Sequence, residues 1–266
     1  MNRRFLFLVL PVLLVAADNR IGVPAAPSAV FEAEAQSIGK SKSPKFFARR
    51  AHGLMMVSTV PQAGGGADLI FQASNDLGDS FADQMRVNDV AGEVSDHGEN
   101  SPQLLTSPDD SMLYAVWGAK DPKNPAGSVI RFSTAGSMRT LWSPAKILND
   151  DGLPVSHSFQ SAAVGPDGII YAAWLDGRDG RSTTEGATGG TTSIYLTKST
   201  DGGKTFSKNV RVARNVCPCC RVAFGFVEGK VLLAWRQLCR PDAGERCGGG
   251  SQRPWGEFTS IAHLTR

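Results

Sequence analysis

Beyond about residue 45, the chain is a succession of short runs in which apolar and polar residues alternate, separated by turns rich in Asp, Gly and Pro. Alternation with a period of two is the pattern of half-buried β-strands, and residues of these types commonly separate such strands. No run in this region has the 3.6-residue period of an amphipathic helix. The pattern therefore predicts an all-β fold.

One of these runs recurs along the chain. Leu113–Trp117, Ile170–Trp174 and Leu232–Trp235 are alike, and their tryptophans follow one another at intervals of 57 and 61 residues. Each copy is preceded by a polar connector, a short apolar strand and a Pro-Asp or Glu-Gly turn, and the first two copies are followed by a polar loop and two further strands. Four strands in a repeat of this kind are the organisation of a β-propeller blade.

The repeat divides the chain into a lead-in and four blades, the last of them atypical. After Trp235, residues 239–250 bring Arg, Gly and Cys together and lose the alternation. We therefore expect about three and a half blades, and hypothesise that the reading frame is damaged or truncated after Trp235; a glycine-rich surface tail is the alternative. The expected boundaries are a flexible lead-in or first edge strand at 18–44 and blades at about 45–91, 99–150, 157–214 and 218–266.

A turn of fixed form occurs twice. Ser199–Phe206 and Ser74–Phe81 both have the pattern Ser-x-Asp-x-Gly-x-x-Phe. Asp201 is expected to accept hydrogen bonds from the turn's own amides, while Gly202 and Gly203 adopt positive φ. In the second blade we interpret Ser133–Gly136 as a degenerate copy that keeps the serine and replaces the aspartate with alanine.

This octet matches the Asp-box of the sialidase-like β-propellers, and from roughly Phe46 to Trp235 the chain resembles secreted proteins of that family. The family closes its propeller with six blades, so the resemblance implies an incomplete propeller here. It also implies that the boxes lie on the face opposite the active site and serve the fold. The residues given this structural role are Ser74, Asp76, Gly78, Phe81, Ser199, Asp201, Gly203 and Phe206.

The first residues predict export. Arg3 and Arg4 precede an apolar run, and small residues before Asp18 offer a cleavage site near Ala17, so residues 1–17 are interpreted as a signal peptide. The run is too short for a comfortable membrane span, which needs about 20 apolar residues. Without Arg3 and Arg4, 26 of the 28 Lys and Arg remain against 25 Asp and Glu. This near-neutral, secreted or periplasmic protein is not expected to bind nucleic acid or to be an integral membrane protein.

The resemblance implies what a sialidase would need. Such enzymes hold the substrate carboxylate with three arginines and use a tyrosine nucleophile assisted by a glutamate, with an aspartate as acid and base. The chain has only three tyrosines, Tyr114, Tyr171 and Tyr195, and all fall in strands where we expect core positions. The arginine pair at residues 49–50 lacks the proline that the family motif has. We therefore expect no complete catalytic set.

Candidate ligand-binding residues gather in the connectors and in the loop after Trp174. Connectors between blades and loops between the second and third strands are expected to share the ligand face. Arginine can grip a carboxylate or a sugar hydroxyl with planar donors. For the loop after Trp174 a salt-bridged turn capped by its own aspartate is the alternative, and for the connectors ordinary loop polarity. The candidates are Asp176, Arg178, Asp179, His97, Glu99 and Arg221.

The third connector is the most distinctive, since it contains Cys217, Cys219 and Cys220. Three thiols in four residues suit zinc or copper, and His157, from the preceding connector, could join them. The alternatives are a disulfide from Cys217 to Cys219 or Cys220, as an exported protein allows, and a reactive thiol. Five cysteines in total leave at least one without a partner in the chain. Similar cysteine-dense connectors occur in uncharacterised, exo-α-sialidase-like members of the family that the chain resembles.

Together these features predict an exported, sialidase-like propeller that binds a glycan or another exported protein without a complete catalytic set. An exo-α-sialidase or a related glycoside hydrolase is the first alternative. A metal-binding protein that uses the cysteine connector is the second.

Overall fold

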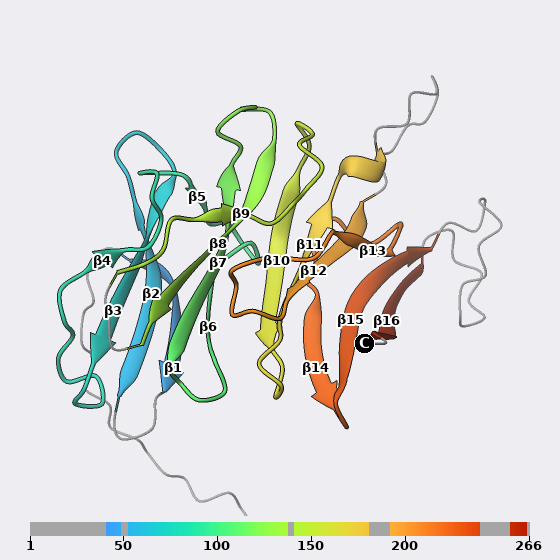
Figure 1. Cartoon of the computed structure of the whole chain (residues 1–266). Coiled ribbons are helices and arrows are strands. Elements are labelled where there is room, and N and C mark those ends of the chain that lie inside the picture. The colour runs from blue at the N-terminus through green and yellow to red at the C-terminus, as the bar shows by residue number, and fades with distance from the viewer. Residues whose placement is uncertain (1–40, 49–52, 138–140, 181–191, 240–255, 265–266) are drawn as a thin grey trace, which may run out of the picture. The chain divides into compact units, whose positions relative to one another are not determined.

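The computed structural model describes residues 41–48, 53–137, 141–180, 192–239 and 256–264, all of which lie in one compact unit, Ile38–Arg266. In these residues every regular element is a β-strand, apart from one short 3-10 turn, η1 (Arg178–Gly180). Figure 1 shows the strands gathered into sheets that follow chain order. Among the described residues, no helix is long and apolar enough to cross a membrane. The all-β prediction is confirmed.

The strands of the described residues fall into four groups in chain order, which we call blades one to four. Blade one contains β1 (Lys42–Ala48), β2 (Leu54–Pro61), β3 (Ala67–Ser74) and β4 (Met85–Arg86). Blade two contains β6 (Gln103–Thr106), β7 (Met112–Lys120), β8 (Ser128–Gly136) and β9 (Lys146–Ile147). Blade three contains β10 (His157–Val164), β11 (Ile170–Asp176), β12 (Ser193–Ser199) and β13 (Val210–Ala213). Blade four contains β14 (Ala223–Val227), β15 (Lys230–Cys239) and β16 (Gly256–Leu264).

Consecutive strands of each blade pair antiparallel. In blade three, for example, Trp174 on β11 lies opposite Tyr195 on β12. A short strand in the first connector, β5 (Val94–Ser95), pairs with both β3 and β7 and joins blades one and two into a nine-stranded sheet. Blades three and four are separate sheets of four and three strands. The described residues thus form consecutive antiparallel sheets of the kind that make up a β-propeller.

The hydrophobic core lies between neighbouring blades. Successive residues of a strand point to opposite faces, so Trp117 on β7 packs toward blade one while Tyr114 and Val116 pack toward blade three. On β11 the same alternation sends Trp174 toward blade two and Tyr171 toward blade four. Both faces of these second strands are therefore covered, and every residue of β11 is buried.

Each of the repeated tryptophans donates its indole N–H to a side-chain oxygen of a different type. A buried indole N–H without an acceptor would be costly, which explains why blades two, three and four each supply one to their repeated tryptophan. The pairs are Trp117 with Glu93 Oε1 at 3.3 Å, Trp174 with Asp176 Oδ2 at 2.8 Å, and Trp235 with Gln237 Oε1 at 2.9 Å.

The two Asp-boxes have the expected turn geometry. Ser199 Oγ accepts from the Gly203 amide at 2.9 Å and donates to Asp201 Oδ1 at 2.8 Å, while Asp201 accepts from the Thr205 amide at 2.9 Å. The first box repeats these contacts from Ser74 and Asp76. In both boxes the serine is buried and the aspartate exposed. Hydrogen bonds, first from Ser74 and then from Ser80, lower the pKa of Asp76 to about 2.

The third box, in blade two, lies two residues later than the sequence suggested. Ser133 is not its serine, because Ser133 Oγ bonds to Ser143 in the way that Thr197 Oγ1 bonds to Ser207 in blade three. This equivalence places Ala135 at the serine position and Trp142 at the aromatic position. The prediction of a retained serine at 133 was therefore wrong, and the box aromatic is the feature that survives.

The box aromatics lock neighbouring blades together. Phe206 of blade three meets Phe132 of blade two edge to face, with ring centroids 4.9 Å apart. Trp142 of blade two meets Phe71 of blade one in the same manner at 5.7 Å. Gly203 permits the first of these contacts, since a Cβ there would lie 2.5 Å from a ring carbon of Phe132.

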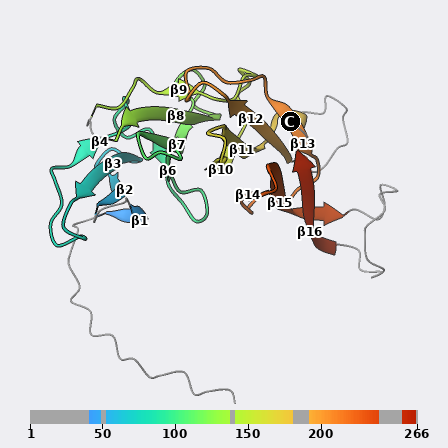
Figure 2. The same cartoon turned by 60° about the horizontal axis from the view of Figure 1, so that its bottom comes forward.

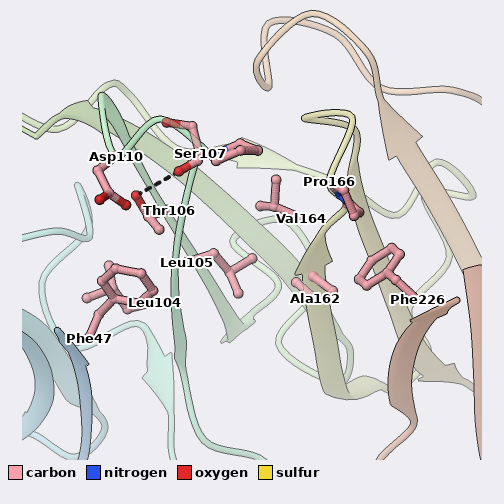
Figure 3. A pocket seen from close by; sticks show the side chains of 13 residues that line it. Phe47, Leu104, Leu105, Thr106, Ser107, Asp110, Ala162, Val164, Pro166 and Phe226 are labelled. Carbon is pink, nitrogen blue, oxygen red and sulfur yellow. Dashed lines mark hydrogen bonds between the residues drawn. The ribbon is translucent and has the colours of Figure 1, made fainter. Parts of the chain in front are cut away.

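The first strands of the blades share one side of the sheets. Figure 2 shows β1, β6, β10 and β14 on this side and β4, β9 and β13 on the other. An apolar pocket of about 540 Å³ lies among these first strands at the end where they turn into the second strands. Figure 3 shows Phe47 of β1 and Phe226 of β14 on its two sides, with Leu104, Leu105 and Ala162 between them.

The two ends of the propeller differ from expectation in detail. β1 begins at Lys42, inside the segment expected to be a lead-in or an edge strand. β15 continues past Trp235 to Cys239 and pairs along its length with β16, a third strand of blade four that the sequence interpretation missed. It was missed because it follows residues that break the alternating pattern. The expected signal peptide at 1–17 and the glycine-rich residues 240–250 lie outside the described residues.

Candidate functional site

The first connector and the start of β10 meet at Arg221, which begins the segment leading into β14. The Arg221 amide donates to Glu99 Oε2 at 2.9 Å, its Nε to the Gln160 carbonyl at 2.9 Å, and its Nη2 to the Ser101 carbonyl at 2.5 Å. Burial lowers the pKa of Arg221, and the charge of Glu99 opposes this shift. We call these four residues the Arg221 junction. It ties blades two, three and four at the end of the first strands opposite the apolar pocket.

Side chains around the junction are held in fixed positions. Gln160 is fully buried and its Nε2 donates to the Ser101 carbonyl at 3.1 Å. Among the described residues, Gln160 Oε1 has no hydrogen-bond partner although it is buried. A buried acceptor without a donor is costly, so this oxygen lowers the stability of the junction.

An aromatic pair lies beside the junction. His97, which is exposed, meets Phe159 edge to face, with ring centroids 5.9 Å apart. Phe159 has φ of +53°, at a point where the β10–β11 register shifts. Its amide donates to Asn100 Oδ1 at 2.8 Å, which helps to hold this backbone conformation. Residues other than glycine adopt positive φ at a cost, and such positions are frequent at functional sites.

The cysteine connector adjoins the junction in sequence and contacts blade four. Sulfur separations are 3.3 Å from Cys217 to Cys219, 3.1 Å from Cys217 to Cys220 and 4.0 Å from Cys219 to Cys220. None of these is a disulfide bond length, and Cys217, Cys219 and Cys220 are free thiols. Arg236 Nη1 donates to Cys220 Sγ at 3.5 Å, and this contact raises the pKa of Arg236.

Asp176 and Arg178, at the end of β11 and the start of η1, form a second group with Asp150. Arg178 Nε lies 3.0 Å from both Asp176 carboxylate oxygens and its Nη1 lies 3.0 Å from Asp150 Oδ1. The guanidinium also lies over the Tyr195 ring, 4.0 Å from its centroid. Hydrogen bonds and charges of Asp176, Asp150 and Asp151 raise the pKa of Arg178 against the effect of its burial. We call this set the Arg178 cluster.

The Arg178 cluster has the geometry of the salt-bridged turn that the sequence left open. The Arg178 amide donates to Asp176 Oδ1 at 2.9 Å, so Asp176 caps its own loop. Arg178 also reaches Asn209 Oδ1 at 3.1 Å. Asp179 contacts strand β12 of the same blade, where its Oδ2 accepts a hydrogen bond from Ser193 Oγ at 2.7 Å. A ligand-binding role for Asp176, Arg178 and Asp179 stays a prediction.

His157 belongs to the Arg178 cluster and is separate from the cysteines. It is fully buried, with Nδ1 2.5 Å from the Ser128 carbonyl and Nε2 3.1 Å from Asp151 Oδ1. Asp176 Oδ2 lies 3.6 Å from the same Nε2. Because both ring nitrogens face oxygen acceptors, the ring has no lone pair directed toward the cysteine connector.

The structure therefore divides the sequence candidates into two groups. Glu99 and Arg221 are in direct contact, with His97 beside them, whereas Asp176, Arg178 and His157 lie in the other cluster. Sequence reasoning missed the partners of these residues. A signal for some of them existed, since Gln103, Gln160 and Arg221 end the three polar connectors at equivalent places. The partners that were missed are Ser101, Phe159, Gln160, Asp150, Asp151, Tyr195 and Asn209.

Solved structures share this fold, although no protein-family model and no curated protein sequence matches the chain. The Hadza microbial sialidase Hz136 aligns with 83% of this chain and 44% of its own, with a TM-score of 0.52 and 13% identity. The GH93 α-L-arabinofuranosidase of Fusarium graminearum, solved in complex with arabinobiose, aligns with 81% of this chain and 64% of its own, with a TM-score of 0.51 and 13% identity.

At 13% identity these matches show a common fold and nothing finer. The chain spans less than half the length of the sialidase and under two thirds of the arabinofuranosidase. The fold of the described residues and these structural neighbours together define a class of protein, the sialidase-like β-propeller.

Proposed function

We propose that the chain is an exported carbohydrate-binding propeller module without a complete catalytic set, related to the branch of sialidase-like repeat proteins that has the cysteine connector. The observation that carries the proposal is the convergence of the first connector, the start of β10 and the cysteine connector at Arg221. Its support includes the structural neighbours, two of which are glycan-active enzymes of the same fold. Another exported protein is the competing ligand, and the test below separates the two.

The chemistry around the junction suits a sugar. Glu99 and His97 are exposed and offer a charged acceptor and a ring nitrogen to hydroxyl groups. Phe159 supplies an apolar surface next to them, and Arg221 supplies a fixed positive charge. Binding sites for small polar ligands combine a few convergent polar groups with apolar or aromatic walls. The pocket among the first strands is lined mostly by apolar side chains and suits a sugar less well.

Glycan binding to the exported full-length protein tests the proposal. A glycan array would identify a ligand, and titration calorimetry would measure its affinity for the unaltered protein and for His97→Ala and Glu99→Gln. We expect each variant to weaken binding by about tenfold, the loss of one polar contact. The matched control is Glu228→Gln, the same chemical change in the β14–β15 turn at the other end of the blade.

Two results would contradict the proposal. One is an affinity that falls as much in Glu228→Gln as in Glu99→Gln. The other is a screen in which no glycan binds to folded protein while an exported protein is captured through the His97 and Glu99 surface. Circular dichroism melts of every variant ensure that losses of binding are compared between folded proteins.

Glycoside hydrolysis is the second candidate, because the neighbours in structure are hydrolases. Against it, all three tyrosines of the chain are buried, at 3% exposure for Tyr114, 4% for Tyr171 and 8% for Tyr195. A buried core tyrosine cannot approach an anomeric carbon. Release of a fluorescent aglycone from a sialoside or an arabinofuranoside, abolished in Glu99→Gln and kept in Glu228→Gln, would favour the hydrolase over the binding module.

A further inference from the structure

We propose that Cys217, Cys219 and Cys220 bind one copper(I) ion through three thiolate sulfurs. This site is separate from the sugar-binding role proposed for the Arg221 junction and stands or falls independently of it. Soft thiolate ligands select soft ions such as copper(I). The proposal rests on the arrangement of the sulfurs, on the frame that holds them and on the charges around them.

The local sequence builds the arrangement. Pro218 and Cys219 form a tight turn, and proline presets the backbone for the first central position of such a turn. The turn brings the side chains before and after it to the same side. Its three sulfurs consequently lie within 4.0 Å of one another.

The triangle of sulfurs has the size of a metal site. A circle through the three sulfurs has a radius of about 2.0 Å, so an ion about 1 Å above their plane lies about 2.3 Å from each sulfur, a usual metal–thiolate distance. Cys219 is exposed, so an ion can reach the site from solvent, while Cys217 is buried and fixes the inner corner. No side chain has to move far for all three sulfurs to bind.

The connector is anchored on both sides of the cysteines. Before them, the Val216 amide donates to the Thr192 carbonyl at 3.1 Å and the Cys217 amide to the Arg236 carbonyl at 2.9 Å. After them, the Arg221 junction fixes the chain, with the Arg221 amide 2.9 Å from Glu99 Oε2. A preorganised set of ligands loses little conformational entropy when an ion binds.

Charge and ligand number favour copper(I). Three thiolates around a monovalent ion carry a net charge of −2, and the Arg236 guanidinium, which donates to Cys220 Sγ at 3.5 Å, offsets part of it. Structural zinc sites almost always have four protein ligands. Among the described residues no fourth His, Cys, Asp or Glu joins this group, and His157 lies in the Arg178 cluster. Copper(I) is satisfied by three sulfurs.

Copper(I) titration of the full-length, reduced protein tests the site. The protein is stripped of metal, reduced, freed of reductant under nitrogen and titrated with copper(I) in competition with the coloured chelator bicinchoninate. We expect one copper ion per chain, seen also as a mass increase in native mass spectrometry. Cys219→Ser, at an exposed position, and Cys220→Ser should each lower the affinity by at least about tenfold, since each removes one of three ligands.

Cys247→Ser is the matched control, the same change at a cysteine outside the connector, and it should leave stoichiometry and affinity unchanged. The proposal is overturned if bicinchoninate retains all the copper. It is also overturned if Cys247→Ser weakens binding as much as Cys219→Ser, or if zinc binds in place of copper(I) under the same conditions. Alkylation mass mapping of the exported protein adds a last test, since a Cys217–Cys219 or Cys217–Cys220 disulfide that persists under mild reduction excludes the site.

Discussion

At the scale of single residues, the two Asp-boxes solve one backbone problem with different side chains. Leu77 and Gly202 occupy the same position and have φ of +63° and +71°. The leucine is 70% exposed, so it gains little from burial, and its backbone conformation is one that glycine adopts at no steric cost. The first box is therefore under more conformational strain than the second.

The next glycine of the second box separates backbone strain from crowding. Gly202 and Gly203 both have positive φ, but a Cβ at Gly202 meets open space while one at Gly203 meets Phe132. We expect Gly202→Ala to cost about 1 kcal/mol of unfolding free energy, and Gly203→Ala to cost about 1–3 kcal/mol more, since it overpacks a ring. Urea denaturation measures both. Equal losses in the two variants would show that the Phe132 contact does not determine the choice of glycine.

Acid should weaken the fold through the exposed turn aspartates. Asp76 and Asp109 have pKa values of about 2, below the ordinary value of 3.8. Between these values the unfolded chain binds more protons than the folded one, so the stability these groups supply above pH 3.8 is lost as the pH falls toward 2. We expect the melting temperature to fall over this window, and to fall less steeply in Asp76→Asn with Asp109→Asn. Identical slopes would contradict the assignment.

The residue scale also shows what the sequence could supply. The Ser-x-Asp-x-Gly-x-x-Phe spacing was sufficient to predict that Asp201 accepts a hydrogen bond from an amide of its own turn, because this contact is local. Whether the aspartate is buried was not predictable, since it depends on neighbouring blades. The partners of Arg221, 61 and more residues away, were out of reach for the same reason.

At the scale of elements, the turn that follows the third strand of a blade carries an aromatic side chain that packs against the preceding blade. The pairs Phe206 with Phe132 and Trp142 with Phe71 recur at equivalent positions of consecutive blades. The alignment of the degenerate box in blade two failed at this scale. This box has neither the serine nor the aspartate, so counting residues from a serine placed it wrongly. Counting back from its aromatic residue, Trp142, would have placed Ala135 correctly at the serine position.

Removing the box aromatic should loosen one blade from the next. We expect Phe206→Ala to reduce the unfolding free energy by about 1–3 kcal/mol, because a half-buried ring and an edge-to-face pair are lost. Phe206→Leu should recover part of this loss through apolar burial. Leu141→Ala, at a side chain that is 86% exposed, is the control and should leave the denaturation midpoint unchanged. A loss in Leu141→Ala equal to that in Phe206→Ala would contradict the interpretation.

At the scale of the whole molecule, period-two alternation, tryptophan spacing and turn residues were sufficient to predict the all-β fold class. They were insufficient for the last strand, because β16 is separated from its partner by residues 240–255, where the pattern is broken. The sequence predicted that the candidate residues share one face of the propeller, but it did not predict which of these residues contact one another. Which connector meets which is decided by the propeller's curvature, and no short-range pattern encodes that.

The Arg221 junction should stabilise the association of blades two to four. Arg221→Lys keeps the charge but cannot supply the planar donors that reach two carbonyls, so we expect a loss of about 1–3 kcal/mol from unpaired buried acceptors. Hydrogen exchange should rise at the amides of Arg221 and Phe159. Arg86→Lys, on exposed β4, is the control. Exchange that rises equally in both variants, or in neither, would show that the junction does not hold the connectors.

The different indole acceptors give the molecule built-in optical reporters. Trp117 bonds a glutamate, Trp174 an aspartate in a buried cluster with His157, and Trp235 an amide. Emission and quenching of indole respond to nearby charge and hydrogen bonding, so the three blades have distinct fluorescence environments. Versions of the chain that keep one of these tryptophans would allow the unfolding of blades two, three and four to be followed one blade at a time.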